Sequence, residues 1–284
     1  MKERRHPDWL KSPLGGGSTY ATVRKQLREA CVHTICEEAK CPNIGECFSR
    51  GTATFLILGD ICTRDCKYCH VDHGTPKKTD VDEPLHVAES VKKLDLTYVV
   101  ITSVTRDDLE DGGAKQFKDT IDQIKKQNPR CKIEVLIPDF KGDVDSLKIV
   151  LSAKPDVVNH NIEVVSSLFD TIRPQGDYQQ SLHVLRKCKK LAPNIPTKSG
   201  FMIGLGESNS EISKLLDDLR GVNVNFLTIG QYLQPSKHHE TVKKYYHPDD
   251  FEELKRLAYE KGFDHVEAAP LVRSSYKAES FLEC

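Results

Sequence analysis

The sequence predicts an α/β fold in which parallel strands alternate with helices that cover them. Short apolar runs rich in β-branched residues recur after residue 50, and stretches with helical spacing separate them. The chain has 284 residues, which suits one large domain with small extensions, because α/β barrels commonly reach roughly 200–250 residues as one unit. Its composition, 38% hydrophobic and 29% charged, is that of a globular protein with an ordinary core.

Six candidate strands follow one another along the chain. Each is rich in Val, Ile, Thr or Phe, and each is bounded by Gly, Pro, Asp or Asn, which favour turns. The expected strands are Thr52–Leu58, Tyr98–Val104, Lys132–Ile137, Val157–Ile162, Thr197–Ile203 and Asn225–Leu233.

The segments between these strands carry apolar residues at helical spacing. The stripes are formed by Leu85, Ala88, Val91 and Leu94, by Phe117, Ile121 and Ile124, by Leu182 and Leu185, and by Leu215, Leu216 and Leu219. A further helix is expected over Asp249–Tyr259, because His247-Pro248 ahead of it is typical of a helix start.

Strands joined by helices pair in parallel, with right-handed crossovers and the helices outside. Two architectures fit this pattern, an open doubly wound sheet and a full or partial β/α barrel, and both place the active site at the carboxyl ends of the strands. The repeat is assigned to residues 51–263. We expect an N-terminal extension over residues 1–50, with Gly15–Ser18 as a flexible loop, and a C-terminal tail over residues 264–284 that holds one more short apolar run.

The charge balance and the N-terminus exclude several classes of function. Lys and Arg total 41 and Asp and Glu total 42, so the chain lacks the basic excess that a nucleic-acid-binding surface requires. The first ten residues lack the apolar stretch of a secretory signal, and no apolar run approaches the roughly 20 residues that span a bilayer. We therefore expect a cytoplasmic protein that binds neither nucleic acid nor membrane.

The cysteines are concentrated near the N-terminus. Seven of the ten lie between Cys31 and Cys69. Since no secretory signal accompanies them, the expected compartment is reducing, and clustered thiols there are metal ligands more often than disulfides.

Cys62, Cys66 and Cys69 form the motif C-x3-C-x2-C just beyond the first expected strand. Three thiolates at this spacing can bind three corners of a 4Fe–4S cluster, and since a fully protein-ligated cluster has four ligands, one iron would stay open for a small molecule. Structural zinc is the alternative, but it usually requires four ligands in paired C-x2-C knuckles. Unligated core cysteines are the remaining alternative.

This motif, with the aromatic Tyr68 before its last cysteine, resembles the signature of the radical S-adenosylmethionine superfamily. The resemblance implies a partial or full β/α barrel whose open iron binds the amino and carboxylate groups of S-adenosylmethionine. It also implies reductive cleavage of that cofactor to methionine and a 5′-deoxyadenosyl radical, which abstracts hydrogen from an unactivated carbon.

A second cysteine motif lies upstream, where Cys36, Cys41 and Cys47 form C-x4-C-x5-C. This motif, the first motif and the tail motif Arg273–Tyr276 together resemble the lipoyl synthase family, and the match extends from Pro7–Leu10 to Tyr276. The resemblance implies a partial (β/α)6 barrel whose mouth is covered by the N-terminal and C-terminal extensions. It further implies that Cys36, Cys41 and Cys47 hold an auxiliary 4Fe–4S cluster with Ser275 as fourth ligand, that Ser275 and Arg273 are catalytic residues, and that Ser274 has no ligand role.

In that family, the auxiliary cluster donates two sulfur atoms to C6 and C8 of an octanoyl group, and two S-adenosylmethionine molecules are consumed per product. The octanoyl group is amide-linked to a lysine of a lipoyl carrier domain. The implied partners are therefore such a domain, from a 2-oxoacid dehydrogenase acyltransferase or the glycine cleavage H protein, and an electron donor such as ferredoxin or flavodoxin. Two alternatives stay open: a different radical enzyme acting on a free small molecule, and a non-enzymatic iron–sulfur or zinc protein.

Polar residues at the strand ends are candidates for binding S-adenosylmethionine. Asn161 and Glu163 follow the fourth expected strand, the guanidinium of Arg173 matches a carboxylate bidentately, and Ser103 and Thr105 end the second expected strand. The superfamily pattern adds Tyr68 to this set. For Asn161, Glu163 and Arg173, a strand-end hydrogen bond or a surface ion pair is the alternative.

Three remaining features are weaker. Gly200–Glu207 does not complete a G-x-G-x-x-G nucleotide loop, and we interpret it as a strand end packed closely against its neighbours near the adenine. His238–Glu240 is either a metal site or, more often for such a sequence, an exposed polar loop. Core or free thiols are expected at Cys31, Cys131, Cys188 and Cys284.

Overall fold

Eight strands form one sheet in the order β1-β2-β5-β6-β7-β8-β9-β10. The structure is a computed structural model that describes residues 7–12, 15–30, 32–50 and 52–282. Strand β1 is antiparallel to β2, and every other neighbouring pair is parallel. The strands are β1 (His33–Thr34), β2 (Thr54–Ile57), β5 (Tyr98–Ser103), β6 (Lys132–Leu136), β7 (Val157–Asn159), β8 (Thr197–Ile203), β9 (Phe226–Gln231) and β10 (His265–Ala269).

The strand order decides between the two predicted architectures. From β2 to β10 each strand pairs with the next one of the sheet along the chain, whereas a doubly wound sheet has a point where the order reverses. No pairing between β1 and β10 occurs in the described part of the chain, so the barrel is not closed. The fold is therefore a partial β/α barrel, as the resemblance predicts.

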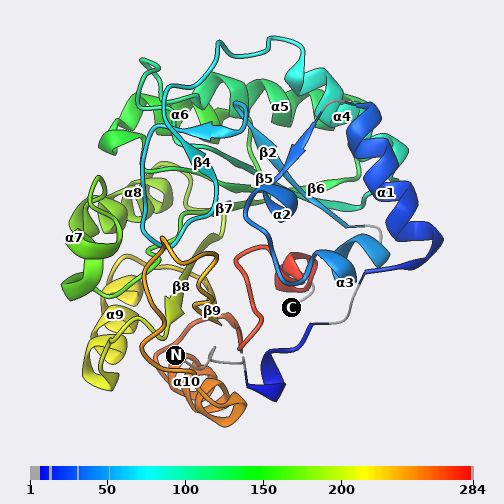
Figure 1. Ribbon diagram of the computed structural model, residues 1–284. Helices are drawn as coiled ribbons and strands as arrows, with labels where there is room; N and C mark the ends of the chain where they lie inside the picture. The colour runs from blue at the N-terminus through cyan, green and yellow to red at the C-terminus, as the bar shows by residue number, and fades with distance from the viewer. Residues whose placement is uncertain (1–6, 13–14, 31, 51, 283–284) are drawn as a thin grey trace.

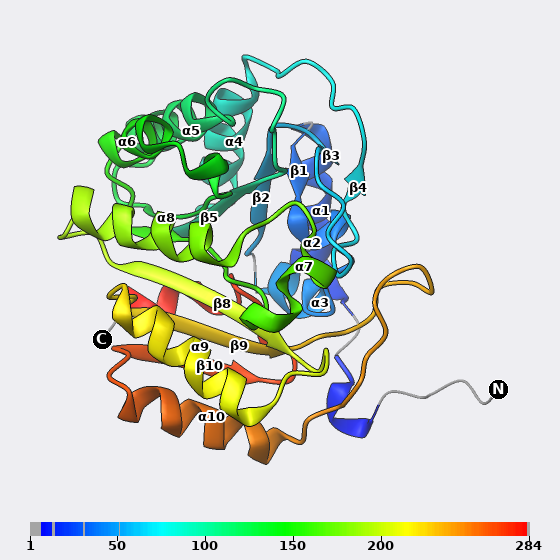
Figure 2. The same cartoon turned by 90° about the vertical axis from the view of Figure 1, so that its left-hand side faces the viewer.

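The main helices form a ring outside the sheet (Figure 1). They are α4 (Glu83–Lys93), α5 (Ala114–Gln127), α6 (Val144–Ser152), α8 (Tyr178–Leu191), α9 (Asn209–Gly221) and α10 (Pro248–Glu260). Figure 2 shows α10 lying along β10. Among the described helices, none combines the length and the apolar character that crossing a membrane requires.

Further elements fill the remaining side of the barrel and the loops. Near the N-terminus these are η1 (Asp8–Leu10), α1 (Gly17–Glu29), α2 (Ile35–Glu38) and α3 (Ile44–Ser49), where η denotes a 3-10 helix. The others are η2 (Phe140–Gly142), η3 (Ser166–Leu168), α7 (Phe169–Ile172), η4 (Ala278–Leu282) and a separate two-stranded sheet of β3 (Ile61–Cys62) and β4 (Asp72–His73).

All six predicted strands are present, with bounds shifted by a few residues at most. The largest shift is in β7, which ends at Asn159 instead of Ile162, because the chain turns away and Glu163 adopts a positive φ of 71°. The sheet also contains β10, within the stretch that the sequence assigns to the tail. Its five residues include His265 and Glu267, so they lack the dense β-branched composition of the other strands.

The N-terminal extension shares the core of the barrel. Val23 and Leu27 of α1 are each 1% exposed and belong to the same apolar cluster as Phe48 and Phe55. Helix α1 begins inside the predicted flexible loop. There, a Cβ on Gly15 would lie 2.8 Å from the Cα of Gly45, so this glycine permits close packing instead of providing flexibility.

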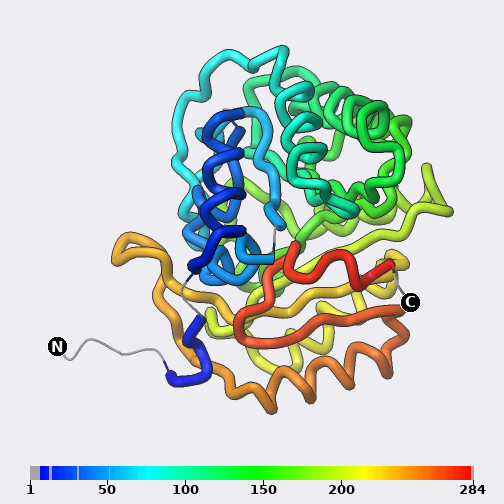
Figure 3. Tube along the Cα trace, turned by 90° about the vertical axis from the view of Figure 1, so that its right-hand side faces the viewer, coloured from blue at the N-terminus to red at the C-terminus, as the bar shows by residue number. Residues whose placement is uncertain are grey.

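The C-terminal tail runs through the barrel interior and lies beside the N-terminal helices (Figure 3). Its last described helix, η4, buries Phe281 against Val157 and Phe226, which are the first residues of β7 and β9. The tail therefore extends from the carboxyl ends of the strands, where the N–H of Gln231 donates to the Pro270 carbonyl, to their amino ends, which the sequence did not predict. Apolar Phe281 requires a buried site, and the amino end of the partial barrel provides one.

Candidate active site

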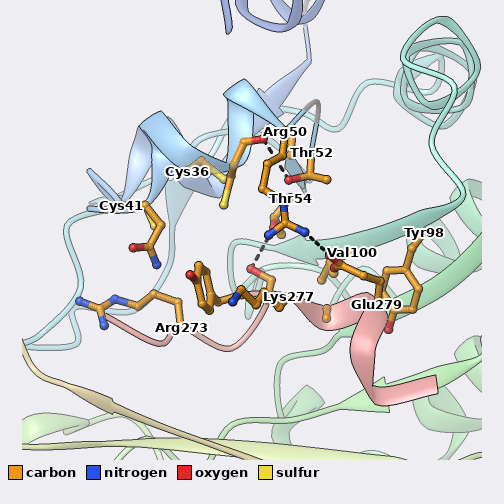
Figure 4. A pocket seen from close by; sticks show the side chains of 16 residues that line it. Cys36, Cys41, Arg50, Thr52, Thr54, Tyr98, Val100, Arg273, Lys277 and Glu279 are labelled. Atoms are coloured by element: carbon orange, nitrogen blue, oxygen red, sulfur yellow. Dashed lines mark hydrogen bonds and ion pairs between the residues drawn. The ribbon is translucent and has the colours of Figure 1, made fainter. Parts of the chain in front are cut away.

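Three cysteines from the N-terminal extension face the C-terminal tail across one pocket (Figure 4). Cys36 lies in α2, whose start is capped by the Thr34 hydroxyl accepting from the Glu37 N–H at 3.3 Å. The pocket opens to solvent, and its empty space, open solvent included, is about 560 Å³. Its lining includes Cys36, Cys41, Cys47, Arg273 and Ser275.

The electrostatics of these thiols favour a bound cation. Burial and the neighbouring thiols raise the pKa of Cys36 to about 12 and that of Cys47 to about 11, and burial raises the pKa of Cys41. Thiolates in this pocket therefore need a positive group to compensate them, which iron would supply. Among the residues that the structure describes, no three His, Cys, Asp or Glu side chains converge on the position of a single ion. In a cubane each cysteine binds a different iron, so its ligands need not converge on one point.

Ser275 joins this pocket from the opposite end of the chain. The Thr54 hydroxyl, on the first residue of β2, donates to Ser275 Oγ at 2.9 Å. Thr54 also lies beside Cys36, where its hydrogen bonding lowers the thiol pKa against the larger opposing effect of burial. A single residue at the amino end of β2 thus contacts a proposed ligand from each terminus.

Side chains within and beside the second cysteine motif hold the tail in place. Asn43 Nδ2 donates to the Leu271 carbonyl at 2.7 Å, and Tyr276 Oη donates to a Glu46 carboxylate oxygen at 3.1 Å. An ion pair of 2.7 Å joins Arg50 to Glu279. The sequence analysis missed these contacts, although Asn43, Glu46 and Tyr276 lie within the motifs that it identified.

The first cysteine motif lies on the loop after β2, where the chain enters the small sheet. Cys62 Sγ accepts from the backbone N–H groups of Arg64 at 3.4 Å and Thr105 at 3.3 Å. Burial raises the pKa of Cys66, and burial raises that of Cys69 to about 12. Thr105 therefore supports the cysteine loop through its backbone, and its contact with the methionine end of the cofactor stays a prediction.

Several predicted cofactor-binding residues gather next to Cys66. Burial raises the pKa of Glu163, and Arg173, Asn161 and Tyr68 oppose this increase, so the four side chains lie within electrostatic reach of one another. The Arg173 guanidinium also lowers the pKa of Cys66 against the larger effect of burial.

Buried polar atoms in this region fit a polar ligand. Asn161 Oδ1, Arg173 Nε and Ser103 Oγ are buried and have no hydrogen-bond partner among the residues of the described chain. Leaving such atoms unpaired costs about 1–3 kcal/mol each, which a ligand carrying carboxylate, amino and ribose groups would recover. The side chains thus suit a polar cofactor such as S-adenosylmethionine.

Within His238–Glu240, His239 and Glu240 contact the first cysteine loop, whereas His238 is exposed. His239 Nε2 lies 2.8 Å from the Cys69 carbonyl, and its Nδ1 lies 2.8 Å from Ser236 Oγ. The Glu240 N–H also donates to the Lys67 carbonyl at 2.9 Å. Both ring nitrogens are engaged, so His239 holds the cysteine loop.

Gly200–Glu207 packs closely, as predicted. A Cβ on Gly200 would lie 2.3 Å from Thr228 Oγ1 and 3.1 Å from Asn161 Oδ1. The Glu207 carboxylate accepts from the N–H groups of Gly204 at 2.6 Å and Leu205 at 2.9 Å, so it stabilises its own loop. The proposed closeness to an adenine stays a prediction.

The other cysteines lie apart from both motifs where they are described. Cys131 and Cys188 are buried free thiols, as expected. Cys31 and Cys284 fall outside the described residues.

Comparison with known proteins identifies the family. A model of the radical SAM superfamily matches residues 56–219, and a model of the N-terminal domain of lipoyl synthase matches residues 1–41. Lipoyl synthase from Caldicellulosiruptor saccharolyticus is 53% identical over 279 residues, covering 98% of this chain and 98% of that protein. The chain belongs to the lipoyl synthase family. A second relative, lipoyl synthase from Halalkalibacterium halodurans, is 54% identical and covers 97% of this chain and 91% of that protein.

Solved structures of more distant proteins share the family's fold. Streptococcus suis SuiB bound to S-adenosylmethionine matches with a TM-score of 0.59 and 10% identity, covering 81% of this chain and 55% of that one. HydG, a maturase of the FeFe-hydrogenase, matches with a TM-score of 0.58 and 13% identity, covering 93% and 67%. At these identities the likeness supports the partial barrel and no specific activity.

Proposed function

We propose that this chain is a lipoyl synthase that inserts sulfur at C6 and C8 of an octanoyl group, amide-linked to a lysine of a lipoyl carrier protein. The observation that carries the proposal is the pocket in which Cys36, Cys41 and Cys47 meet Ser275 of the tail. Near-full-length identity to lipoyl synthases supports it. The proposed carrier is a 2-oxoacid dehydrogenase acyltransferase or a glycine cleavage H protein, and the proposed electron donor is a protein such as ferredoxin or flavodoxin. The cytoplasmic location stays a prediction from the sequence.

The two cysteine sets have different roles. Cys62, Cys66 and Cys69 would hold a 4Fe–4S cluster with one open iron, and Cys36, Cys41 and Cys47 would hold the auxiliary cluster with Ser275. When bound, the first cluster and S-adenosylmethionine supply a radical able to abstract hydrogen from an unactivated carbon, and the second supplies sulfur. Two carbons each lose one hydrogen, which accounts for two S-adenosylmethionine molecules per product.

The side chains around these clusters would bind the cofactor and the auxiliary cluster and orient them. Arg173 offers a guanidinium for the cofactor carboxylate, and the unpaired oxygens of Asn161 and Ser103 suit its other polar groups. Ser275 provides an oxygen ligand, which is harder and more basic than thiolate, so that its bond to iron is easier to release on protonation. Arg273 lies between the two sites, because its charge acts on both Cys41 and Glu163.

The test uses anaerobically reconstituted protein with S-adenosylmethionine, a reductant and an octanoyl-lysyl peptide, followed by mass analysis. The wild type should carry about eight irons and form the lipoyl product. Replacing Cys62, Cys66 and Cys69 by Ala should leave about four irons and abolish 5′-deoxyadenosine formation.

The matched variant replaces Cys36, Cys41 and Cys47 by Ala. It should also keep about four irons and should still form 5′-deoxyadenosine, but no carbon–sulfur bond. Lipoyl product from this variant would show that the sulfur has another source. A preparation saturated with zinc and lacking iron–sulfur absorption would refute the whole assignment.

A further inference from the structure

A buried polar network lies on the face of the sheet that contacts the tail. Glu134 of β6 and Lys198 of β8 have fully buried side chains, and their charged atoms are 3.1 Å apart. Asn159, on β7 between them, donates through Nδ2 to Glu134 Oε1 at 2.9 Å. Tyr98 Oη donates to Glu134 Oε2 at 2.8 Å, so both carboxylate oxygens are satisfied.

The register explains why these side chains meet. Paired residues on neighbouring strands point to the same face, and Asn159 is paired with Lys198. Val100 is paired with both Thr54 and Glu134, which places Thr54 on this face as well. The network and the Thr54 hydroxyl that contacts Ser275 therefore belong to one surface.

The network reaches the tail at two points. Asn159 Nδ2 also donates to Ser274 Oγ at 3.0 Å, and Lys198 Nζ lies 3.9 Å above the centre of the Phe281 ring. Ser274 precedes the start of η4 and Phe281 lies within η4, so the two contacts hold the tail on both sides of that start. Ser274 is also adjacent to Ser275. Two contacts therefore fix Ser275. Asn159 holds the preceding residue, Ser274, and Thr54 holds the side chain of Ser275 itself.

Stability alone does not account for this arrangement. A buried ion pair contributes little compared with apolar residues of the same volume, and its best-attested use is to specify one arrangement among several. The apolar contacts of Phe281 bury the tail but are non-directional. A hydrogen bond to Ser274 is directional, so it selects one register of the tail.

We propose that Ser274, Asn159 and the Glu134–Lys198 pair are positioning residues that fix the tail so that Ser275 faces the three cysteines of the auxiliary site. This inference rests on the proposed function, in which Ser275 is a cluster ligand. Ser274 itself binds no iron, as the family resemblance implies, but it is not inert.

The test measures how fast a chelator removes the auxiliary irons from the full chain in which Cys62, Cys66 and Cys69 are replaced by Ala. Ser274→Ala should accelerate this loss about tenfold, the equivalent of one lost hydrogen bond. It should also change the electronic spectrum of the cluster in the same direction as Ser275→Ala does. Ser274→Thr keeps the hydroxyl and should restore both the rate and the spectrum.

Ser152→Ala is the control, since it removes a hydroxyl that donates to the Ile149 carbonyl within α6, outside the tail. It should leave the rate of iron loss unchanged. The ion pair is tested as Glu134→Gln with Lys198→Met, because removing Lys198 alone would leave a buried unpaired carboxylate. This double variant should accelerate iron loss at least twofold.

Ser275→Ala separates the two proposals. If it does not alter iron loss or the spectrum, Ser275 is not a ligand and the proposed function loses that assignment. If Ser275→Ala alters both while Ser274→Ala and the double variant behave as wild type, the ligand assignment stands and the positioning inference is wrong.

Discussion

Replacing Arg64 by Met tests how the loop between Cys62 and Cys66 is held. The guanidinium makes two bidentate pairs, with Asp107 at 2.7 and 2.9 Å and with Asp139 at 2.7 and 2.8 Å. The Arg64 side chain is 6% exposed and that of Asp139 is fully buried. Burial alone would raise the pKa of Asp139, but the hydrogen bonds and charge of Arg64 hold it well below its usual range.

The magnitude follows from what the substitution leaves behind. Without Arg64, the Asp139 carboxylate is buried and uncompensated, which costs about 3–5 kcal/mol of unfolding free energy. Asp107 is 24% exposed, so its lost pair adds at most about 1 kcal/mol. Asp139→Asn in the same chain removes the uncompensated charge, and the double variant should therefore be more stable than Arg64→Met alone.

The measurement is urea unfolding under anaerobic conditions, together with the iron content after reconstitution. Arg106→Met is a matched control, because Arg106 is also buried and bidentate but its partner Asp108 is 39% exposed. Arg106→Met should lower the free energy of unfolding by about 1–2 kcal/mol, which includes the lost hydrogen bond to the Leu58 carbonyl. Arg64→Met should also reduce the iron held by the first cysteine set.

Two results would refute this reasoning. Equal losses for Arg64→Met and Arg106→Met would show that the burial of the partner carboxylate does not determine the cost. The stability losses of Arg64→Met and Asp139→Asn could instead add, making the double variant less stable than either single variant. That result would show that the charge of Asp139 is not the source of the penalty.

Three further substitutions test other parts of the site. Ser275→Cys should retain the auxiliary irons, since thiolate is a normal iron ligand, yet slow product formation; a wild-type rate would show that ligand release is not required. Thr54→Val removes the donor to Ser275 and should accelerate loss of the auxiliary irons to a chelator, by less than Ser275→Ala does; an unchanged rate would contradict this. His160 is buried with its Nε2 unpaired among the described residues, and burial lowers its pKa from 6.5 to about 4. Between about pH 4 and 6.5, His160 therefore binds a proton in the unfolded chain but not in the folded chain. The free energy of unfolding has its full value above about pH 6.5 and falls by about 3 kcal/mol as the pH approaches 4. In a plot of unfolding free energy against pH, His160→Gln should be flatter than wild type between about pH 4 and 6.5. Parallel curves would show that His160 is not the group responsible.

The sequence by itself determined the repeating units and the chemistry of the cysteines. Strand and helix patterns are local, since they depend on residues a few positions apart, and six strands could therefore be located. The motif of Cys62, Cys66 and Cys69 is equally local, because its spacing reflects how one loop can surround one cluster. Strand β10 was missed because His265 and Glu267 interrupt the local pattern on which such predictions depend.

Tertiary structure alone decided what lies next to what across the chain. Nothing in the spacing of residues connects Thr54 with Ser275, or Asn159 with Ser274, because these contacts depend on strand register and on the path of the tail. His239 likewise belongs to an unremarkable polar stretch until the fold places it against the Cys69 carbonyl. The sequence shows which groups could bind iron, whereas the geometry that aligns them arises from packing between distant segments, which local patterns do not encode.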